Sequence, residues 1–193
     1  MNIEHYLVDN KIDKLIKKAL SDDELKSILG KDAKIILYPD LKKHNSIDEL
    51  LPRPNDFCII LLVEDQNKYQ IEGHWCALLK YDGLFEWFDP YGEPVDFDLI
   101  HWLDKTTRIR LHENKKYLTY LLKDRIVIHN KIKYEKLRRG VNTCGSHVAY
   151  RIYNFLKKNM TLEQYQKHMA DLSKNFGLSY DKLVAAFVSN YIK

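Results

Sequence analysis

Residues 73–92 read GHWCALLKYDGLFEWFDPYG, which is the pattern of two antiparallel strands joined by a tight turn. Apolar and aromatic side chains dominate Trp75 to Tyr81 and again Leu84 to Asp89. The dipeptide Asp82-Gly83 between them is typical of two-residue hairpin loops. Pro90 cannot donate a hydrogen bond to a strand ladder, so the second strand should end before it. The stretch therefore predicts a β-hairpin whose second strand ends at the rim of a sheet.

The register of this hairpin places two side chains with acid–base chemistry next to each other. With a two-residue loop, Tyr81 pairs with Leu84, and Cys76 then lies opposite Asp89. His74 is two residues from Cys76 on the same strand, so it faces the same side as Asp89, about 7 to 8 Å away at the backbone. A carboxylate in that place can orient the imidazole of a general base and stabilise its protonated form.

The rest of the chain predicts helices towards both ends and short strands between them. Helices are expected around Ile12 to Leu20 and over Ser21 to Gly30, Ser46 to Leu51, Asn114 to Lys123, Gly145 to Lys157, Thr161 to about Ser173, and Ser179 to Ile192. Further strands are expected at Lys34 to Tyr38, Phe57 to Val63 and Ile126 to His129. The predicted class is α+β, a small mixed central sheet flanked by helices. A length of 193 residues suits one domain, residues 1–193.

A candidate nucleophile, Cys144, precedes the most strongly amphipathic helical segment, Gly145 to Lys157. A thiol at a helix N-terminus lies at the positive end of the helix dipole, which favours the thiolate. Gly145 leaves room for a substrate beside the sulfur, and a backbone N–H at the helix start can stabilise an oxyanion. The segment therefore predicts a thiol able to attack a carbonyl group.

The other cysteines and the second histidine of this region indicate no chemistry. Three widely spaced cysteines do not make a disulfide framework, so reduced thiols are expected. Cys58 and Cys76 lie in apolar strand patterns and are predicted to be small buried side chains. His147 lies one helical turn after Cys144, but no second Cys/His pair accompanies it, so we predict no metal site.

The charge and hydropathy of the chain limit the kinds of partner that it can have. The net charge is +4, and a basic stretch precedes Cys144, made of Lys131, Lys133, Lys136, Arg138 and Arg139. A solvated surface is the simplest reading of this stretch, with weak nucleic-acid binding as the alternative. The longest apolar run, Cys58 to Val63, is far too short to span a bilayer, and the N-terminus lacks the layout of a signal peptide. We therefore expect an intracellular protein without membrane association.

Three motifs occur in an order that resembles a known family. They are Gly73-His74-Trp75, then Phe88-Asp89-Pro90-Tyr91-Gly92, then Thr143-Cys144-Gly145. This order resembles the adenovirus maturation protease (adenain), which is related to the SUMO-specific proteases. The resemblance covers roughly Phe57 to Phe155. The remaining portions share a general similarity with adenain-like proteases of virophages, Polinton-type elements and large DNA viruses. The resemblance implies a papain-like thiol protease fold.

The resemblance also implies a role for each matched residue. Cys144 would be the nucleophile, His74 the general base and then acid, and Asp89 the acid that orients the histidine. Trp75 would flank that histidine. The family places an oxyanion-hole glutamine six or seven residues before the nucleophile, where this chain has Arg138 and Leu137. A second oxyanion donor would then come from Arg138 or from Asn142.

The function implied is that of a cysteine endopeptidase that cleaves viral capsid or structural precursor proteins at Gly-X or similar sites during virion maturation. Such an enzyme would be a monomer in the host cytoplasm or virus factory and in the virion. It would require no cofactor, although DNA and a viral peptide activate the family. The alternatives are a deconjugating protease for a ubiquitin-like protein, a thiol acetyltransferase with an acyl cofactor, and a catalytically impaired module that binds nucleic acid or capsid protein.

Overall fold

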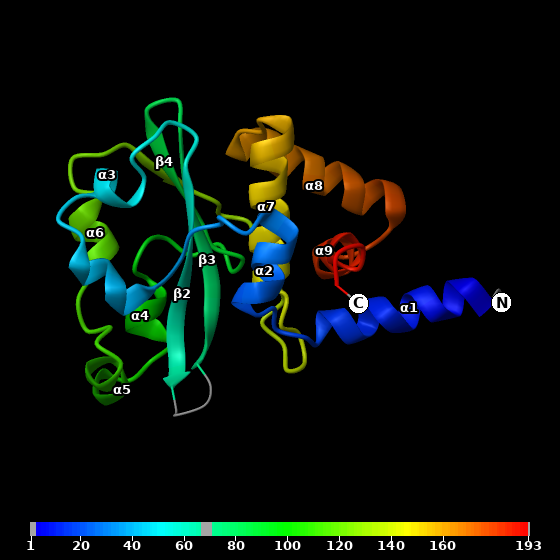
Figure 1. Ribbon diagram of the computed structural model, residues 1–193. Coiled ribbons are helices and arrows are strands. Elements are labelled where there is room, and N and C mark those ends of the chain that lie inside the picture. The colour runs from blue at the N-terminus through cyan, green and yellow to red at the C-terminus, as the bar shows by residue number, and fades with distance from the viewer. Residues whose placement is uncertain (1–2, 67–70, 193) are drawn as a thin grey trace. The chain divides into compact units, whose positions relative to one another are not determined.

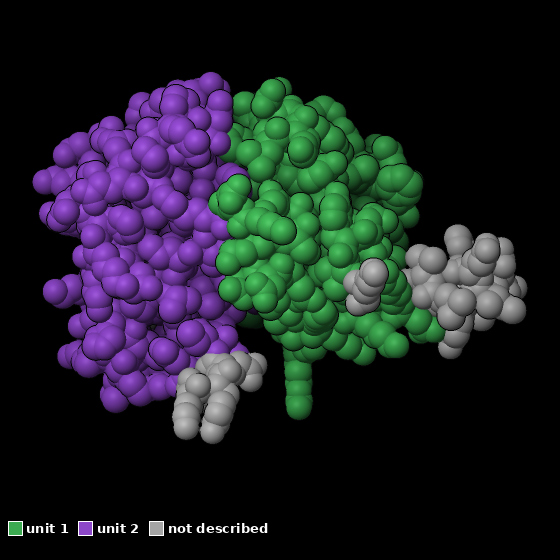
Figure 2. All heavy atoms as spheres, viewed as in Figure 1, with its two compact units in different colours: residues 1–32, 132–193 green, residues 33–131 purple. Residues whose placement is uncertain are grey.

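The computed structural model describes residues 3–66 and 71–192, which divide into two compact units. Unit 1 is made of residues 1–32 and 132–193, and unit 2 of residues 33–131, as Figure 2 shows by colour. Unit 2 carries the sheet, and unit 1 is helical (Figure 1). The predicted α+β class with a small mixed sheet is confirmed. One domain over residues 1–193 stays a prediction.

The sheet of unit 2 has five strands in the order β1-β2-β3-β4-β5. Their bounds are Ile35–Leu37, Phe57–Gln66, Ile71–Tyr81, Leu84–Phe88 and Val127–His129. The three central strands are antiparallel, whereas β1 pairs in parallel with β2 and β5 in parallel with β4. The helical elements of the unit are η1 (Tyr38–Lys43), α3 (Ile47–Leu50), α4 (Asp98–His101), α5 (Lys105–Arg110) and α6 (Tyr117–Leu121). In Figure 1, α3, α4 and α6 lie on one side of the sheet.

The core of unit 2 forms because alternate strand residues face those helices. Cys58, Ile60 and Leu62 of β2 contribute to it, as do Cys76 and Leu78 of β3. Residues from η1, α3 and α6 complete the same cluster, among them Tyr38, Leu41, Ile47, Leu50, Leu118 and Leu121. The face that carries Cys76 is also the face expected for His74, two residues earlier.

The predicted hairpin is confirmed in detail. Tyr81 pairs with Leu84 across the two-residue loop. Both loop residues have positive φ, 49° at Asp82 and 77° at Gly83, as the favoured type of hairpin turn requires. The ladder continues to the pair Ala77 and Phe88, which sets the register up to the end of β4.

Strand β2 extends beyond its predicted end to Gln66, and β3 begins before its predicted start, at Ile71. The pairing of these two strands shifts register between Val63 and Asp65. Gly73 makes the close approach of the strands at this shift feasible. A Cβ atom there would lie 2.0 Å from the carbonyl oxygen of Leu62, far inside contact distance. Glycine is therefore required directly before His74, and this requirement fixes the path of the strand that presents the histidine.

Unit 1 consists of α1 (Ile3–Ile16), α2 (Asp22–Leu29), α7 (Cys144–Lys158), α8 (Leu162–Phe176) and α9 (Tyr180–Val188). Helix α9 packs against α1, α7 and α8, and α2 packs against α7. Capping boxes are present at the starts of α2 and α8, where Ser21 and Thr161 each exchange hydrogen bonds with the third helical residue. The hydroxyl of Ser179 caps the start of α9 by accepting the N–H of Lys182.

Some predicted boundaries were wrong. Helix α9 ends at Val188 and not at Ile192, because Ser189 and Asn190 turn their side chains back onto the carbonyl of Ala186. Helix α6 begins at Tyr117 and not at Asn114.

Among the described residues, the helices are all too short or too polar to span a lipid bilayer.

Candidate active site

His74 and Asp89 form a hydrogen-bonded pair at the end of the β3–β4 hairpin. The imidazole Nε2 lies 2.7 Å from Oδ1 of Asp89. Both side chains are buried, with 4% of His74 and none of Asp89 exposed. The contact predicted from the two-residue loop is thereby confirmed. A carboxylate in its ionised form only accepts hydrogen bonds, and Nε2–H is then the donor of this bond.

The turn after β4 holds the carboxylate of Asp89 in place. The N–H of Tyr91 donates to Oδ1 at 2.9 Å, and the N–H of Glu93 donates to Oδ2 at 3.2 Å. The N–H of Gly92 donates to the carbonyl oxygen of Asp89 at 2.8 Å. Both carboxylate oxygens thus have donors from the backbone, which fixes the orientation of the acid towards His74.

Asn130 fixes the backbone of Asp89 from the other side. Its Nδ2 donates to the Asp89 carbonyl oxygen at 2.6 Å, and its Oδ1 accepts the Asp89 N–H at 2.9 Å. Asn130 is fully buried. It directly follows β5, which runs parallel to β4, so the two strand ends meet at one edge of the sheet. Sequence reasoning missed this residue, since only the parallel pairing of β4 with β5 would have indicated it.

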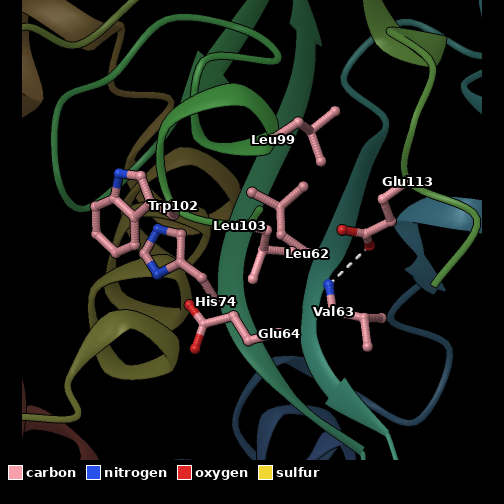
Figure 3. A pocket seen from close by; sticks show the side chains of 8 residues that line it. All are labelled: Leu62, Val63, Glu64, His74, Leu99, Trp102, Leu103 and Glu113. Atoms are coloured by element: carbon pink, nitrogen blue, oxygen red, sulfur yellow. Dashed lines mark hydrogen bonds between the residues drawn. The ribbon is translucent and has the colours of Figure 1, made fainter. Parts of the chain in front are cut away.

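Two aromatic rings flank the imidazole. The ring of Tyr91 stacks on His74 with centroids 4.4 Å apart, and that of Trp102 lies 6.0 Å away. Figure 3 shows the Trp102 indole beside His74. Trp75, expected to flank the histidine, is its neighbour on β3, so strand alternation directs it to the opposite face of the sheet. Trp102 comes from the segment after α4, which the sequence did not predict.

A pocket opens beside the imidazole within unit 2 (Figure 3). It encloses about 250 Å³, solvent at its open mouth included. Its walls are mostly apolar, and it is lined by Leu62, Val63, Glu64, His74, Leu99, Trp102, Leu103 and Glu113. Glu113 is buried and accepts the N–H of Val63 at 2.8 Å through Oε1. Its Oε2 has no hydrogen-bond partner among the described residues.

The burial of Glu113 predicts a pH-dependent stability. Burial raises the pKa of this carboxyl from 4.5 to about 7, with Glu64 adding to the shift and the Val63 N–H opposing it. The folded protein then holds the proton more tightly than the unfolded chain. The contribution of Glu113 to the free energy of unfolding is fully present below pH 4.5. This contribution is lost as the pH rises to about 7, and the loss is about 3 kcal/mol at most.

We therefore expect Glu113→Gln to become more stable than the unmodified protein as the pH rises from 5 to 8, because glutamine stays neutral and still accepts the Val63 N–H. Urea unfolding of both proteins across this pH range measures the difference. Glu64→Gln is the control for the neighbouring acid, whose charge adds to the raised pKa of Glu113. If the unmodified protein and Glu113→Gln lose stability to the same extent as the pH rises, the assignment of this pH dependence to Glu113 is wrong.

Cys144 is the first residue of α7 in unit 1, so the helix begins one residue earlier than predicted. Cys144 as a residue is 7% exposed, whereas Cys58 and Cys76 are fully buried. Burial also raises the pKa of the Cys58 thiol to about 12, which the charge of Lys34 only partly opposes. A 15-residue helix directs its positive end towards Cys144, as the nucleophile assignment requires.

Two buried carboxylates hold Thr143, the residue before Cys144. The Thr143 N–H donates to Glu135 Oε1 at 2.8 Å, and its hydroxyl donates to Asp181 Oδ1 at 2.7 Å. His147 also contacts Asp181, at 3.2 Å through Nε2. Burial lowers the pKa of His147, which keeps it neutral, while its hydrogen bond to Asp181 opposes the shift. These contacts make His147 part of the support of α7, in keeping with the packing role expected from sequence.

The oxyanion candidates and Gly145 also belong to unit 1. Gly145 is the second residue of α7 and is buried. Arg138 and Asn142 are exposed in the segment before the helix. The side-chain amide of Asn142 donates to the carbonyl oxygen of Lys17 at 2.8 Å, so this donor is engaged in holding the chain. The structure thus joins His74 to Asp89 in unit 2 and groups Cys144 with its neighbours in unit 1. The catalytic roles of these residues are proposals.

A viral protein and several solved structures are similar to this chain. No family model matches it. Solved structures of the SUMO protease Ulp1, with the catalytic cysteine oxidized to a sulfonic or a sulfinic acid, share 10% identity and a TM-score of 0.37. The matches cover 89% and 91% of this chain and 78% and 80% of those chains. The uncharacterized protein V9 of Sputnik virophage is 30% identical over 173 residues, which cover 87% of this chain and 93% of V9. The chain therefore belongs to the family of Sputnik virophage protein V9.

Proposed function

We propose that this protein is a cysteine protease with Cys144 as nucleophile, His74 as general base and acid, and Asp89 as the orienting acid. The observation that carries the proposal is the 2.7 Å hydrogen bond between His74 and Asp89, with its carboxylate held by two backbone N–H groups. A carboxylate held in this way can orient the imidazole of a general base and stabilise its protonated form. The position of Cys144 at the start of a long helix supplies the nucleophile.

The proposed mechanism assigns separate tasks to the two imidazole nitrogens. Because Nε2 is bonded to Asp89, Nδ1 is the atom that takes the proton from the Cys144 thiol. The thiolate attacks the scissile carbonyl carbon, and the tetrahedral intermediate collapses to a thioester as His74 returns the proton to the leaving amine. Water then attacks the thioester, with His74 again as the base, and releases the acid product and the free thiol.

The negative oxygen of the tetrahedral intermediate requires hydrogen-bond donors. The backbone N–H of Cys144 at the helix start is one, and a second donor is needed because one is rarely enough. Arg138 stands at a family glutamine position, stays charged at any working pH and carries five N–H donors. Since Asn142 already donates to Lys17, Arg138 is the better candidate.

Replacing Arg138 by alanine should therefore lower turnover at least tenfold with little change in substrate affinity, because the contact forms in the transition state. Steady-state kinetics that separate kcat from KM provide the measurement. Asn142→Ala is the matched control from the same segment. Unchanged turnover in Arg138→Ala together with a loss in Asn142→Ala would move the role to Asn142.

The proposed substrates are viral structural precursors, cut after small residues such as glycine during virion maturation. The motif order shared with adenain supports this, as does membership of a virophage protein family. The test is mass spectrometry of products from a random peptide library, with the Cys144→Ala protein as control. Cleavage at small-residue sites that the control lacks supports the proposal. Cleavage confined to isopeptide-linked conjugates would instead identify a deconjugating protease, and acyl transfer without hydrolysis would identify an acetyltransferase.

A further inference from the structure

A thiol lies next to the His74–Asp89 pair, on the same face of the sheet. His74 and Cys76 are two residues apart on β3 and so point the same way. The hairpin register, extended by one pair beyond Ala77 and Phe88, brings Cys76 opposite Asp89. One ligand atom from each of the three side chains, a nitrogen, a sulfur and a carboxylate oxygen, lies within 4.8 Å of the other two.

This set of donors has the chemistry of a zinc site. Zn²⁺ binds histidine nitrogen, cysteine sulfur and carboxylate oxygen at about 2.0 to 2.3 Å, often with three protein ligands and one open position. Ligand atoms around a tetrahedral ion lie about 3.5 Å apart, so small side-chain rotations would close the site. The bound state is also neutral, because one thiolate and one carboxylate balance the two charges of the ion. A neutral set is favoured where all three ligands are buried.

The outer contacts of these ligands are those that support metal sites. Backbone N–H groups of Tyr91 and Glu93 hold the Asp89 carboxylate, and stacking on Tyr91 and Trp102 fixes the plane of the imidazole. Such contacts orient ligands and maintain metal affinity. The site therefore combines three suitable donors with a rigid support, all from unit 2.

We propose that His74, Cys76 and Asp89 form a site at which Zn²⁺ binds and inhibits the protein. Only the effect of the ion on turnover rests on the proposed function. On binding, the Cys76 thiol releases its proton to solvent and a zinc–sulfur bond forms. The imidazole binds through one nitrogen and carries its proton on the other. The bound ion occupies the groups that orient and transfer the proton in the proposed mechanism, so turnover stops until the metal leaves.

The binding test uses the Cys144→Ala protein, from which the candidate nucleophile is absent. Competition with a chromophoric chelator should show one Zn²⁺ per chain. Adding Cys76→Ala should weaken binding at least a hundredfold, whereas adding Cys58→Ala, which removes the buried thiol of the neighbouring strand, should leave it unchanged. Equal affinity in these two variants, or no binding by the Cys144→Ala protein, would overturn the site.

A second measurement leaves Cys76 intact, so it does not depend on how that variant folds. The chain has three cysteines, and the Cys58→Ala, Cys144→Ala double variant keeps Cys76 alone. With Co²⁺ as the probe, this protein should show a thiolate-to-metal charge-transfer band, and absence of the band would exclude Cys76 as a ligand.

The effect on turnover is measured separately, as each enzyme's rate with Zn²⁺ divided by its own rate without it. Zinc should inhibit the Cys58→Ala enzyme strongly and the Cys76→Ala enzyme at least tenfold less. Equal inhibition of both would refute the inhibitory role. Zinc binding that depends on Cys76 in a protein that cleaves no peptide would leave the metal site standing and reject the protease.

Discussion

Turnover is expected to fall on the order of 10⁵-fold when Cys144 is replaced by alanine, and by a similar factor in His74→Ala. Both substitutions remove an atom that reacts, the attacking sulfur or the nitrogen that moves the proton. Asp89→Ala should cost at least tenfold less, since it removes only the group that orients the imidazole. The rates are measured on a peptide chosen from the library products, with circular dichroism to verify folding.

Two further variants sharpen this comparison. Asp89→Asn keeps a side-chain oxygen that can accept a hydrogen bond from the Nε2–H of His74, so it should retain more activity than Asp89→Ala. Cys58→Ala removes a buried thiol of the core and should leave turnover within a few-fold of the unmodified enzyme. If Cys144→Ala cleaves as well as Cys58→Ala does, the assignment of the nucleophile is wrong.

The second large effect concerns the reactivity of the three thiols. At neutral pH, iodoacetamide should alkylate Cys144 at least a hundredfold faster than Cys58 or Cys76. Alkylation requires an accessible thiolate. Cys58 and Cys76 are fully buried, and the pKa of about 12 leaves Cys58 almost entirely protonated. Cys144 is buried too but keeps 7% of its surface exposed, and it is the first residue of α7, at the positive end of the helix.

Peptide mass mapping after timed quenching gives the three rates. In concentrated urea, where burial is lost, all three thiols should react at comparable rates, which is the control for intrinsic reactivity. Alkylation of Cys76 as fast as that of Cys144 in the folded protein would instead place an accessible thiolate in unit 2 and remove the basis for the nucleophile.

The hairpin and its acid–base pair could be predicted because their signals are local. Asp82-Gly83 selects one turn type, that turn sets the register, and the register brings His74 to Asp89. Strand alternation also explains why Cys76 lies on the same face. Only fifteen residues separate the members of the pair, so no distant packing had to be known.

The supports of the site could not be predicted, because they depend on contacts between distant segments. Asn130 reaches Asp89 across 41 residues, and Asp181 reaches Thr143 across 38. Glu113 bonds to Val63 from 50 residues away. The short helix that precedes Trp102, α4, has four residues, too few for a periodic pattern to indicate it.

The discontinuity of unit 1 bears on how the protein matures on the ribosome. Residues 33–131 form a continuous unit, so His74 can meet Asp89 while later residues are still being translated. Unit 1 needs α9, which packs against both α1 and α7, and α9 is translated after the other helices. The helix that presents Cys144 should therefore become stable only when residues up to about 188 have left the exit tunnel. On the proposed assignment, the nucleophile is therefore the last of the three catalytic residues to be held by a stable element.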